Sequence, residues 1–275
     1  MRKLQVEEAK MRACRDFGFR VREEPVDMFV AHTGHFWGIF ETRDYCRARL
    51  GLATDLSYLA HEYEVKPLLE KMLDHRLELL RLIASDDLGL RYTVPFDLLN
   101  VNRDADCYTF IEHWVKKANG SPKGQDVDRL KDVFEGAEYE KYSSLAFLAA
   151  MSQIKLRNIA QYESETKQAN KFAGTSSGKK IGPDALEHVQ HHLLTTADGL
   201  KLTAEVIEEQ ERHLNRYFRI MNENIPTFLK AIVNPGPLMS MSPPDSWGTC
   251  TRIPGAHARI ERLVGKKPTY DCSMD

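Results

Sequence analysis

The sequence has few cysteines, and none of them lies in a metal-finger pattern. Its 275 residues include five cysteines, all widely spaced and without a CxxC pair: Cys14, Cys46, Cys107, Cys250 and Cys272. An odd number of cysteines at wide spacing is typical of reduced thiols in an intracellular protein. Because a structural zinc site needs several thiolate or imidazole ligands at short spacing, we expect no cysteine-based zinc site and no cofactor.

Long apolar runs are also missing. No run approaches 18 residues, so no transmembrane helix is expected. Residues 1–20 are charged throughout and lack the apolar core of a secretory signal. The 38 Lys and Arg residues nearly balance the 40 Asp and Glu residues, which disfavours a nucleic-acid or membrane surface. We therefore expect a protein of the cytoplasm or the nucleus, and the sequence does not choose between them.

What the sequence does contain is helical periodicity. Apolar residues recur at steps of three and four over 42–61 and 65–83, and no segment alternates with a period of two, so the predicted class is all-α. Pro67 fits the first turn of the second of these helices, whereas Pro95 should bend the helix predicted over 88–101. Further helices are predicted over 3–17, 104–117, 126–135, 139–162, 183–222 and 256–264.

A polar stretch divides the predicted helices. Residues 163–182 have almost no large apolar side chains, which predicts a flexible linker. Residues 1–162 are predicted to form a helical-repeat domain, and residues 183–234 to form helices that pack on that repeat. Residues 235–275 are predicted to be a proline-rich tail with one short helix, and the sequence leaves open whether this tail is ordered.

Two segments suggest an internal repeat. DLSYLAHEYEV (55–65) and DLLNVNRDADC (97–107) share an Asp-Leu start, an apolar position and an acidic turn. The two segments start 42 residues apart. Periods in the thirties and forties are typical of helical solenoids, in which a tetratricopeptide unit has about 34 residues. The sequence therefore predicts a short α-solenoid of tetratricopeptide-like (TPR-like) helix-turn-helix repeats with flanking capping helices.

Several longer strings carry a resemblance to a known group. The segments 31–53, 77–99 and 102–114 resemble fungal TPR-like proteins, and 228–240 and 253–265 resemble the C-terminal signatures of that group. Some members carry a MYND-type zinc finger. The resemblance implies a helical-repeat protein that acts as a protein-binding scaffold. The Cys/His array of a MYND finger is absent from this sequence, so a zinc-dependent role is not carried over.

Two aromatic residues are the first candidates for contact with a partner. Phe36 and Trp37 either form an exposed anchor, as large aromatics do at interfaces, or fill the end of the first helical pair. The burial tendency of large aromatics favours the second alternative.

Three arginines are the other candidates. Arg43, Arg47 and Arg91 either bind a carboxylate-bearing peptide or, for Arg47 and Arg91, pair with Asp86 or Asp87 across helices. For any single arginine the structural pair is favoured, because an arginine within a packed repeat needs a partner.

Other motifs are weaker. Glu187, His188, His191 and His192 are spaced as on one helix face and are compatible with a metal-dependent hydrolase or transferase. They contain no HEXXH, so a solvated face is favoured. AGTSSGKK (173–180) lacks the Ser or Thr of a phosphate-binding loop. RHLNRYFR (212–219) is compatible with an RNA-binding solenoid, but its acidic neighbourhood favours an ordinary amphipathic helix.

The sequence thus predicts a non-enzymatic module that binds another protein or peptide, with no nucleic acid and no membrane as partner. Its oligomeric state is left open.

Overall fold

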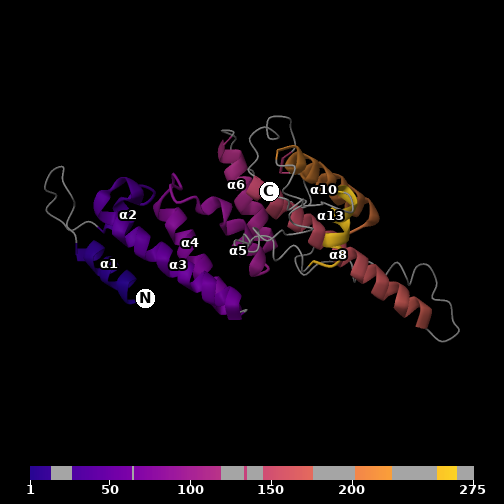
Figure 1. Cartoon of the computed structure of the whole chain (residues 1–275), viewed down its shortest axis with the longest axis horizontal. Helices are drawn as coiled ribbons and strands as arrows, with labels where there is room; N and C mark the ends of the chain where they lie inside the picture. The colour runs from indigo at the N-terminus through magenta and orange to yellow at the C-terminus, as the bar shows by residue number, and fades with distance from the viewer. Residues whose placement is uncertain are drawn as a thin grey trace, which may run out of the picture. The chain divides into compact units, whose positions relative to one another are not determined.

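The computed structural model describes residues 1–13, 27–63, 65–118, 133–134, 145–175, 202–224 and 253–264. Within these ranges the regular structure is helical, with one isolated antiparallel bridge between His35 and Ile83 (Figure 1). The prediction of the all-α class is confirmed. The chain divides into two compact units, Met1–Cys107 and Tyr108–Asp275, rather than at the predicted boundary near residue 162.

The helices are as follows. The first unit contains α1 (Arg2–Ala13), α2 (Met28–Ala31), the 3-10 turns η1 (Phe36–Gly38) and η2 (Phe40–Thr42), α3 (Arg43–Tyr63), α4 (Lys66–Leu82), η3 (Leu90–Tyr92) and α5 (Val94–Asn100). The boundary between the units falls within α6 (Asp104–Ala118), and the second unit also contains α8 (Leu145–Thr175), α10 (Ala204–Asn224) and α13 (Ala256–Val264). The helices predicted over 42–61, 65–83, 104–117 and 256–264 are confirmed. The helix predicted over 126–135, the first part of 183–222 and residues 14–17 lie outside the described residues, apart from a turn at 133–134.

Helices α3 and α4 form an antiparallel hairpin. Tyr45 near the start of α3 shares a core cluster with Leu79 near the end of α4, whereas Leu56 near the end of α3 packs with Met72 nearer the start of α4. Both helices carry apolar residues at three- and four-residue steps, so each buries one stripe against the other. Pro67 lies in the first turn of α4, where its missing N–H has no intrahelical partner to lose.

The prediction of one helix over 88–101 is wrong. It contains a turn, η3 and then α5, and Pro95 lies in the first turn of α5 rather than inside a longer helix. The cause is Asp86, whose buried carboxylate accepts hydrogen bonds from the backbone N–H groups of Leu90 (2.8 Å) and Arg91 (3.0 Å). Gly89 then takes a left-handed backbone conformation (φ 68°), which breaks the helical path.

The two segments aligned as a repeat adopt different structures. Residues 55–63 all lie within α3, and Ala60 is buried inside that helix. Residues 97–107 instead span the end of α5, a turn and the start of α6, with Asn102 in the left-handed conformation (φ 62°). The shared letters therefore do not mark equivalent positions of a structural repeat.

The prediction of a flexible linker over 163–182 is also wrong for its first part. Helix α8 does not end near residue 162 but continues to Thr175, through more than half of the predicted linker. Residues 163–172 are rich in Glu, Gln, Lys and Ala, which favour helix without needing to be buried. The rest of the predicted linker, 176–182, lies outside the described residues. Within the second unit α10 packs against α8, and its buried stripe includes Ile207, Leu214 and Phe218.

Candidate functional site

Phe36 belongs to the core of the first unit. Its side chain is 0% exposed, and its ring lies 5.3 Å from that of Phe29 and 6.2 Å from that of Tyr45. The Thr42 hydroxyl donates to the Phe36 carbonyl and holds the two 3-10 turns together. The prediction of Phe36 as a partner contact is therefore wrong, because the ring fills the end of the helical pair, as the alternative interpretation expected.

Trp37 is partly exposed and packs against the same core cluster as Phe36, so it also helps to fill the end of the helical pair. Its carbonyl accepts a hydrogen bond of 2.9 Å from Arg43 Nε, and the Arg43 guanidinium carbon lies 5.5 Å from the Trp37 ring centroid. The Arg47 guanidinium carbon lies 5.8 Å from the same ring. These are distances at which cations are attracted to an aromatic face. The structure thus brings three of the predicted contact residues together.

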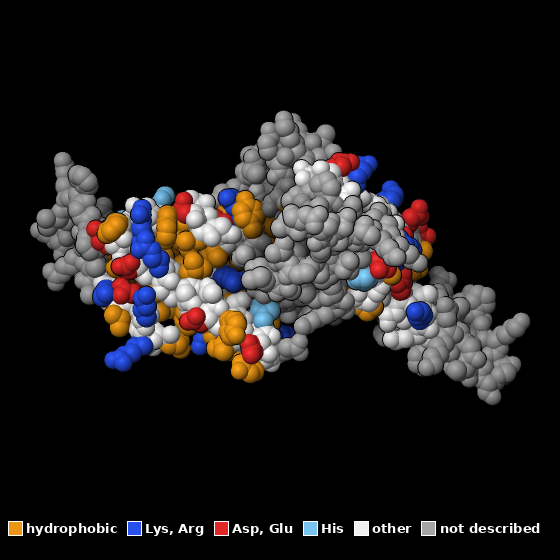
Figure 2. Space-filling view, viewed as in Figure 1, with side chains coloured by type: hydrophobic (Ala, Val, Ile, Leu, Met, Phe, Trp, Pro, Cys, Tyr) orange, Lys and Arg blue, Asp and Glu red, His pale blue; other side chains and the backbone are white. Residues whose placement is uncertain are grey.

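The structure adds a residue that the sequence reasoning missed. The Phe40 ring is 75% exposed and lies 5.8 Å from the Arg43 guanidinium carbon. We call Trp37, Phe40, Arg43 and Arg47 the Trp37 surface. The available signal was a second bulky aromatic three residues after Trp37, but the spacing alone does not place the two rings, because the extended Ile39 separates the two 3-10 turns that hold them. Figure 2 shows hydrophobic and basic side chains interspersed on the first unit.

The arginines pair differently from one another. Arg47 bonds to Asp44 on its own helix, with Nη1 3.0 Å from Oδ1, and both side chains are exposed. Arg91 Nε lies 3.3 Å from Oδ2 of Asp86, whose side chain is almost fully buried. Arg91 therefore pairs with one of its two predicted partners, but within one turn rather than across helices, whereas Arg47 pairs with Asp44 instead of Asp86 or Asp87. Arg91 is not part of the Trp37 surface.

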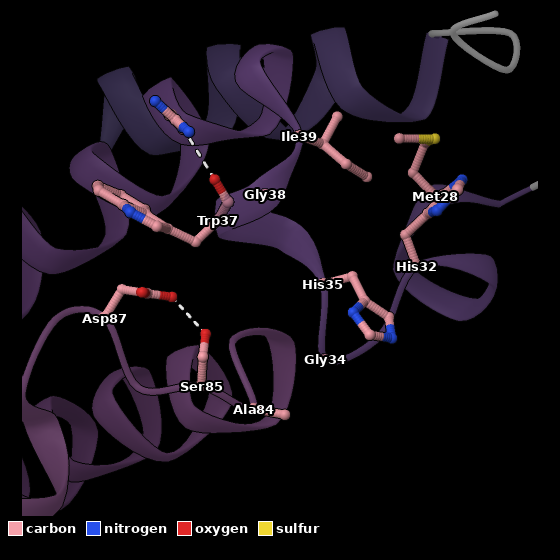
Figure 3. A pocket seen from close by; sticks show the side chains of 11 residues that line it. Met28, His32, Gly34, His35, Trp37, Gly38, Ile39, Ala84, Ser85 and Asp87 are labelled. Carbon is pink, nitrogen blue, oxygen red and sulfur yellow. Dashed lines mark hydrogen bonds between the residues drawn. The ribbon is translucent and has the colours of Figure 1, made fainter.

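A pocket of about 670 Å³ adjoins the Trp37 surface. Its lining consists of Met28, His32, Gly34, His35, Trp37, Gly38, Ile39, Arg43, Ala84, Ser85 and Asp87. In Figure 3, Trp37 and Asp87 lie on one side of the space, and His35, His32 and Met28 lie on the other. The two lining segments are joined by a backbone hydrogen bond of 3.0 Å from Ala84 N–H to the Gly34 carbonyl.

The polar groups of the pocket differ in how they are engaged. The Ser85 hydroxyl donates to the Asp87 carboxylate. Arg43 uses only Nε for a hydrogen bond within the described part of the chain, so its two terminal nitrogens remain available to a ligand. The pocket therefore offers a guanidinium fork beside an aromatic wall, an arrangement suited to a planar anion next to an apolar group.

The buried thiols are unsuited to nucleophilic chemistry. Cys46 and Cys107 are both free and buried. Burial raises the pKa of the Cys46 thiol to about 11. Since the thiolate is the reactive form, Cys46 is inert near neutral pH.

The remaining sequence candidates are placed as follows. Glu187, His188, His191 and His192 lie outside the described residues. Where the structure is described, no group of three His, Cys, Asp or Glu residues is arranged to hold a metal ion. In α10, Tyr217 and Phe218 are buried, which confirms the interpretation of 212–219 as an ordinary amphipathic helix. None of the helices, over the described ranges, has the length and apolar character needed to cross a membrane.

Comparison with family models, with curated proteins and with solved structures finds no match for this chain.

Proposed function

We propose that this protein is a non-enzymatic interaction module of TPR-like type that binds another protein or peptide through the Trp37 surface. The observation that carries the proposal is the exposed Phe40 ring, which shares the Arg43 guanidinium with the partly exposed Trp37, at 5.8 Å and 5.5 Å from the two ring centroids. Aromatic residues and arginine dominate the energetics of protein interfaces.

The exposed Phe40 ring leaves apolar area that a partner could bury. A phenylalanine that is 75% exposed gains little from folding, since its apolar area stays in water. Burial of that area under a partner would recover the stabilisation, at roughly 25 cal/mol per Å². The adjacent guanidinium groups keep the surface soluble and supply hydrogen-bond donors at its centre.

The helical scaffold supports the TPR-like part of the proposal. The α3–α4 hairpin is one helix-turn-helix unit, and α5 follows it and packs against α4 within the first unit. Helical pairs with short connections are the units from which α-solenoids are stacked. Because Trp37 and Phe40 lie in the 3-10 turns just before α3, the hairpin holds both rings on a rigid base.

A photo-crosslinking experiment tests the proposal. The full chain is expressed in its source cells with p-benzoylphenylalanine in place of Phe40. We expect one discrete crosslinked species, which is lost when Arg43→Ala and Arg47→Ala are combined with the probe. The matched control places the same probe at Tyr58, an aromatic residue of α3 that is 70% exposed.

Three results would contradict the proposal. They are the absence of a crosslinked species from position 40, the same species from position 58, and a species that persists in a folded double-alanine variant. Helical circular dichroism of the purified double variant establishes that it is folded.

A further inference from the structure

We propose that the pocket beside the Trp37 surface receives an acidic side chain of the partner together with the apolar side chain next to it. This inference rests on the proposed function, because it names the chemistry that the partner presents. The pocket volume of about 670 Å³ lies within the roughly 300–1,000 Å³ of ligand sites.

Arg43 is the residue that would bind the acidic side chain of the partner. Its Nε is fixed on the Trp37 carbonyl at 2.9 Å, so the terminal nitrogens are held in place without a protein acceptor among the described residues. A guanidinium fork matches a carboxylate with two parallel hydrogen bonds. His32 and His35 also line the pocket, and because an imidazole carries no negative charge, neither residue would repel a carboxylate.

Asp87 is the one carboxylate among the described residues of the lining, and its charge must be weighed against that of Arg43 to decide whether the pocket favours an anion or a cation. Its oxygen already accepts a hydrogen bond from the Ser85 hydroxyl. It is also exposed, so water screens its charge more than that of the partly buried Arg43. The balance therefore favours an anion at the Arg43 end of the pocket over a cation at the Asp87 end.

Trp37 and Ile39, which line the pocket and are partly exposed, would contact the apolar side chain of the partner. Met28 also lines the pocket but is 1% exposed, so it has almost no apolar area left to bury. A carboxylate that approaches Arg43 brings its neighbouring group against this apolar lining. An aliphatic neighbour would remove apolar area from water on both sides of the contact.

The pocket is also preorganised. Arg43 is held between its hydrogen bond to Trp37 and its ring contacts with Trp37 and Phe40. The two lining segments are fixed to each other by the Ala84–Gly34 hydrogen bond. Groups that are already ordered lose little conformational freedom on binding, which leaves more of the interaction energy for affinity.

The test uses three blocked tetrapeptides, acetylated and amidated, and the full chain. Their sequences are Gly-Glu-Leu-Gly, Gly-Gln-Leu-Gly and Gly-Lys-Leu-Gly. Binding is followed by nuclear magnetic resonance through the indole N–H signal of Trp37, one of three tryptophans, which is assigned with Trp37→Phe. We expect the Glu peptide to bind about tenfold more tightly than the Gln peptide, as for a hydrogen bond to a charged group, and the Lys peptide to bind most weakly.

Variants identify the residue responsible. Arg43→Gln should remove the preference for Glu over Gln, and Arg43→Lys should keep only part of it, since an ammonium lacks the fork. Arg81→Gln is the control, because Arg81 is an exposed arginine that bonds to Glu78 and Thr33 and does not line the pocket. It should leave all three affinities unchanged.

The inference is overturned if the three peptides bind equally, if the Lys peptide binds most tightly, or if Arg43→Gln keeps the preference. The comparison of peptides on the unaltered protein does not depend on how any variant folds. A crosslinked partner at Phe40 without a preference for Glu would leave the proposed function standing and reject the acidic ligand alone.

Discussion

Arg76 of α4 and Asp97 of α5 form an ion pair in the interior of the first unit. Arg76 Nη1 lies 2.7 Å from each of the two carboxylate oxygens, and the side chains are only 14% and 5% exposed. The pair ties α5 to the α3–α4 hairpin. The burial of this pair leaves Arg76 Nε without a hydrogen-bond partner among the described residues.

Removal of one side chain of the Arg76–Asp97 pair should strongly destabilise the first unit. Asp97→Leu leaves the Arg76 charge buried and unpaired, which costs about 3–5 kcal/mol of stability. Arg76→Met should cost a similar amount, whereas the double variant should lose less than either single variant because no buried charge remains. Amide hydrogen exchange in α4 and α5 measures these losses. Strictly additive losses would show that the two side chains are not coupled.

Replacement of Gly34 by alanine adds a single methyl group at a strained backbone position. Its φ of +87° is strained for any residue with a side chain, and an added Cβ would lie 3.3 Å from the Ala84 Cβ. Gly34→Ala should therefore destabilise the first unit by about 1–2 kcal/mol. Gly38→Ala is the control, because nothing lies within 4 Å of its added Cβ. Hydrogen exchange of the Ala84 amide, which bonds to the Gly34 carbonyl, provides the measurement, and equal effects of the two substitutions would argue against the strain.

The helical hairpin was predictable because it depends on a local pattern. Leu56 and Met72 lie on apolar stripes of period 3.6, and two consecutive helices with such stripes bury them by packing against each other. The extension of α8 to Thr175 was not predictable from burial, since a helix of polar residues such as Glu163 need not bury a face. Propensity alone supports it, and propensity is a weak indicator in a sequence read without its tertiary contacts.

The site was less predictable than the fold. Phe36 and Trp37 are adjacent in the sequence, and which ring enters the core depends on the rotation of a 3-10 turn that leaves no periodic signal. The pocket also joins the segment of Gly34 to that of Ala84, and these meet through a backbone hydrogen bond that no residue type specifies. Arg91 was predictable as a structural pair because Asp86 lies nearby in the sequence.

Arg259 should hold α13 in the second unit. It is 16% exposed and bonds to Glu211 of α10 at 2.7 Å and to Glu163 of α8, so it joins three helices. Arg259→Ala should cost about 1 kcal/mol, because both glutamates are half exposed and are screened by water. Faster amide exchange across α13 is the expected result, and it should shrink at high salt. Arg262→Ala is the comparison variant on an exposed position of the same helix, and it should raise the exchange rates less, because Arg262 donates at 3.3 Å to the Ala258 carbonyl of its own helix and is bound to neither of these glutamates. Equal rates in the two variants would exclude the role of Arg259.

His75 of α4 should make stability depend on pH. Both ring nitrogens are buried and have no hydrogen-bond partner in the part of the chain that the structure describes. Burial, followed by the charges of Arg49 and Lys71, lowers the pKa of His75 below its ordinary 6.5, against the opposing charge of Asp74. The unfolded chain therefore binds more protons than the folded one just below pH 6.5. The neutral ring's contribution to stability is full above the unfolded pKa and is lost as the pH falls through the folded pKa. In His75→Leu, which cannot take up this proton, the free energy of opening of α4 should fall less between pH 7.5 and pH 5.5 than in the unaltered protein. Hydrogen exchange of α4 amides at the two pH values, corrected for the intrinsic exchange rates, provides the comparison. The same decrease in both proteins would mean that His75 takes no part in the acid sensitivity of the first unit.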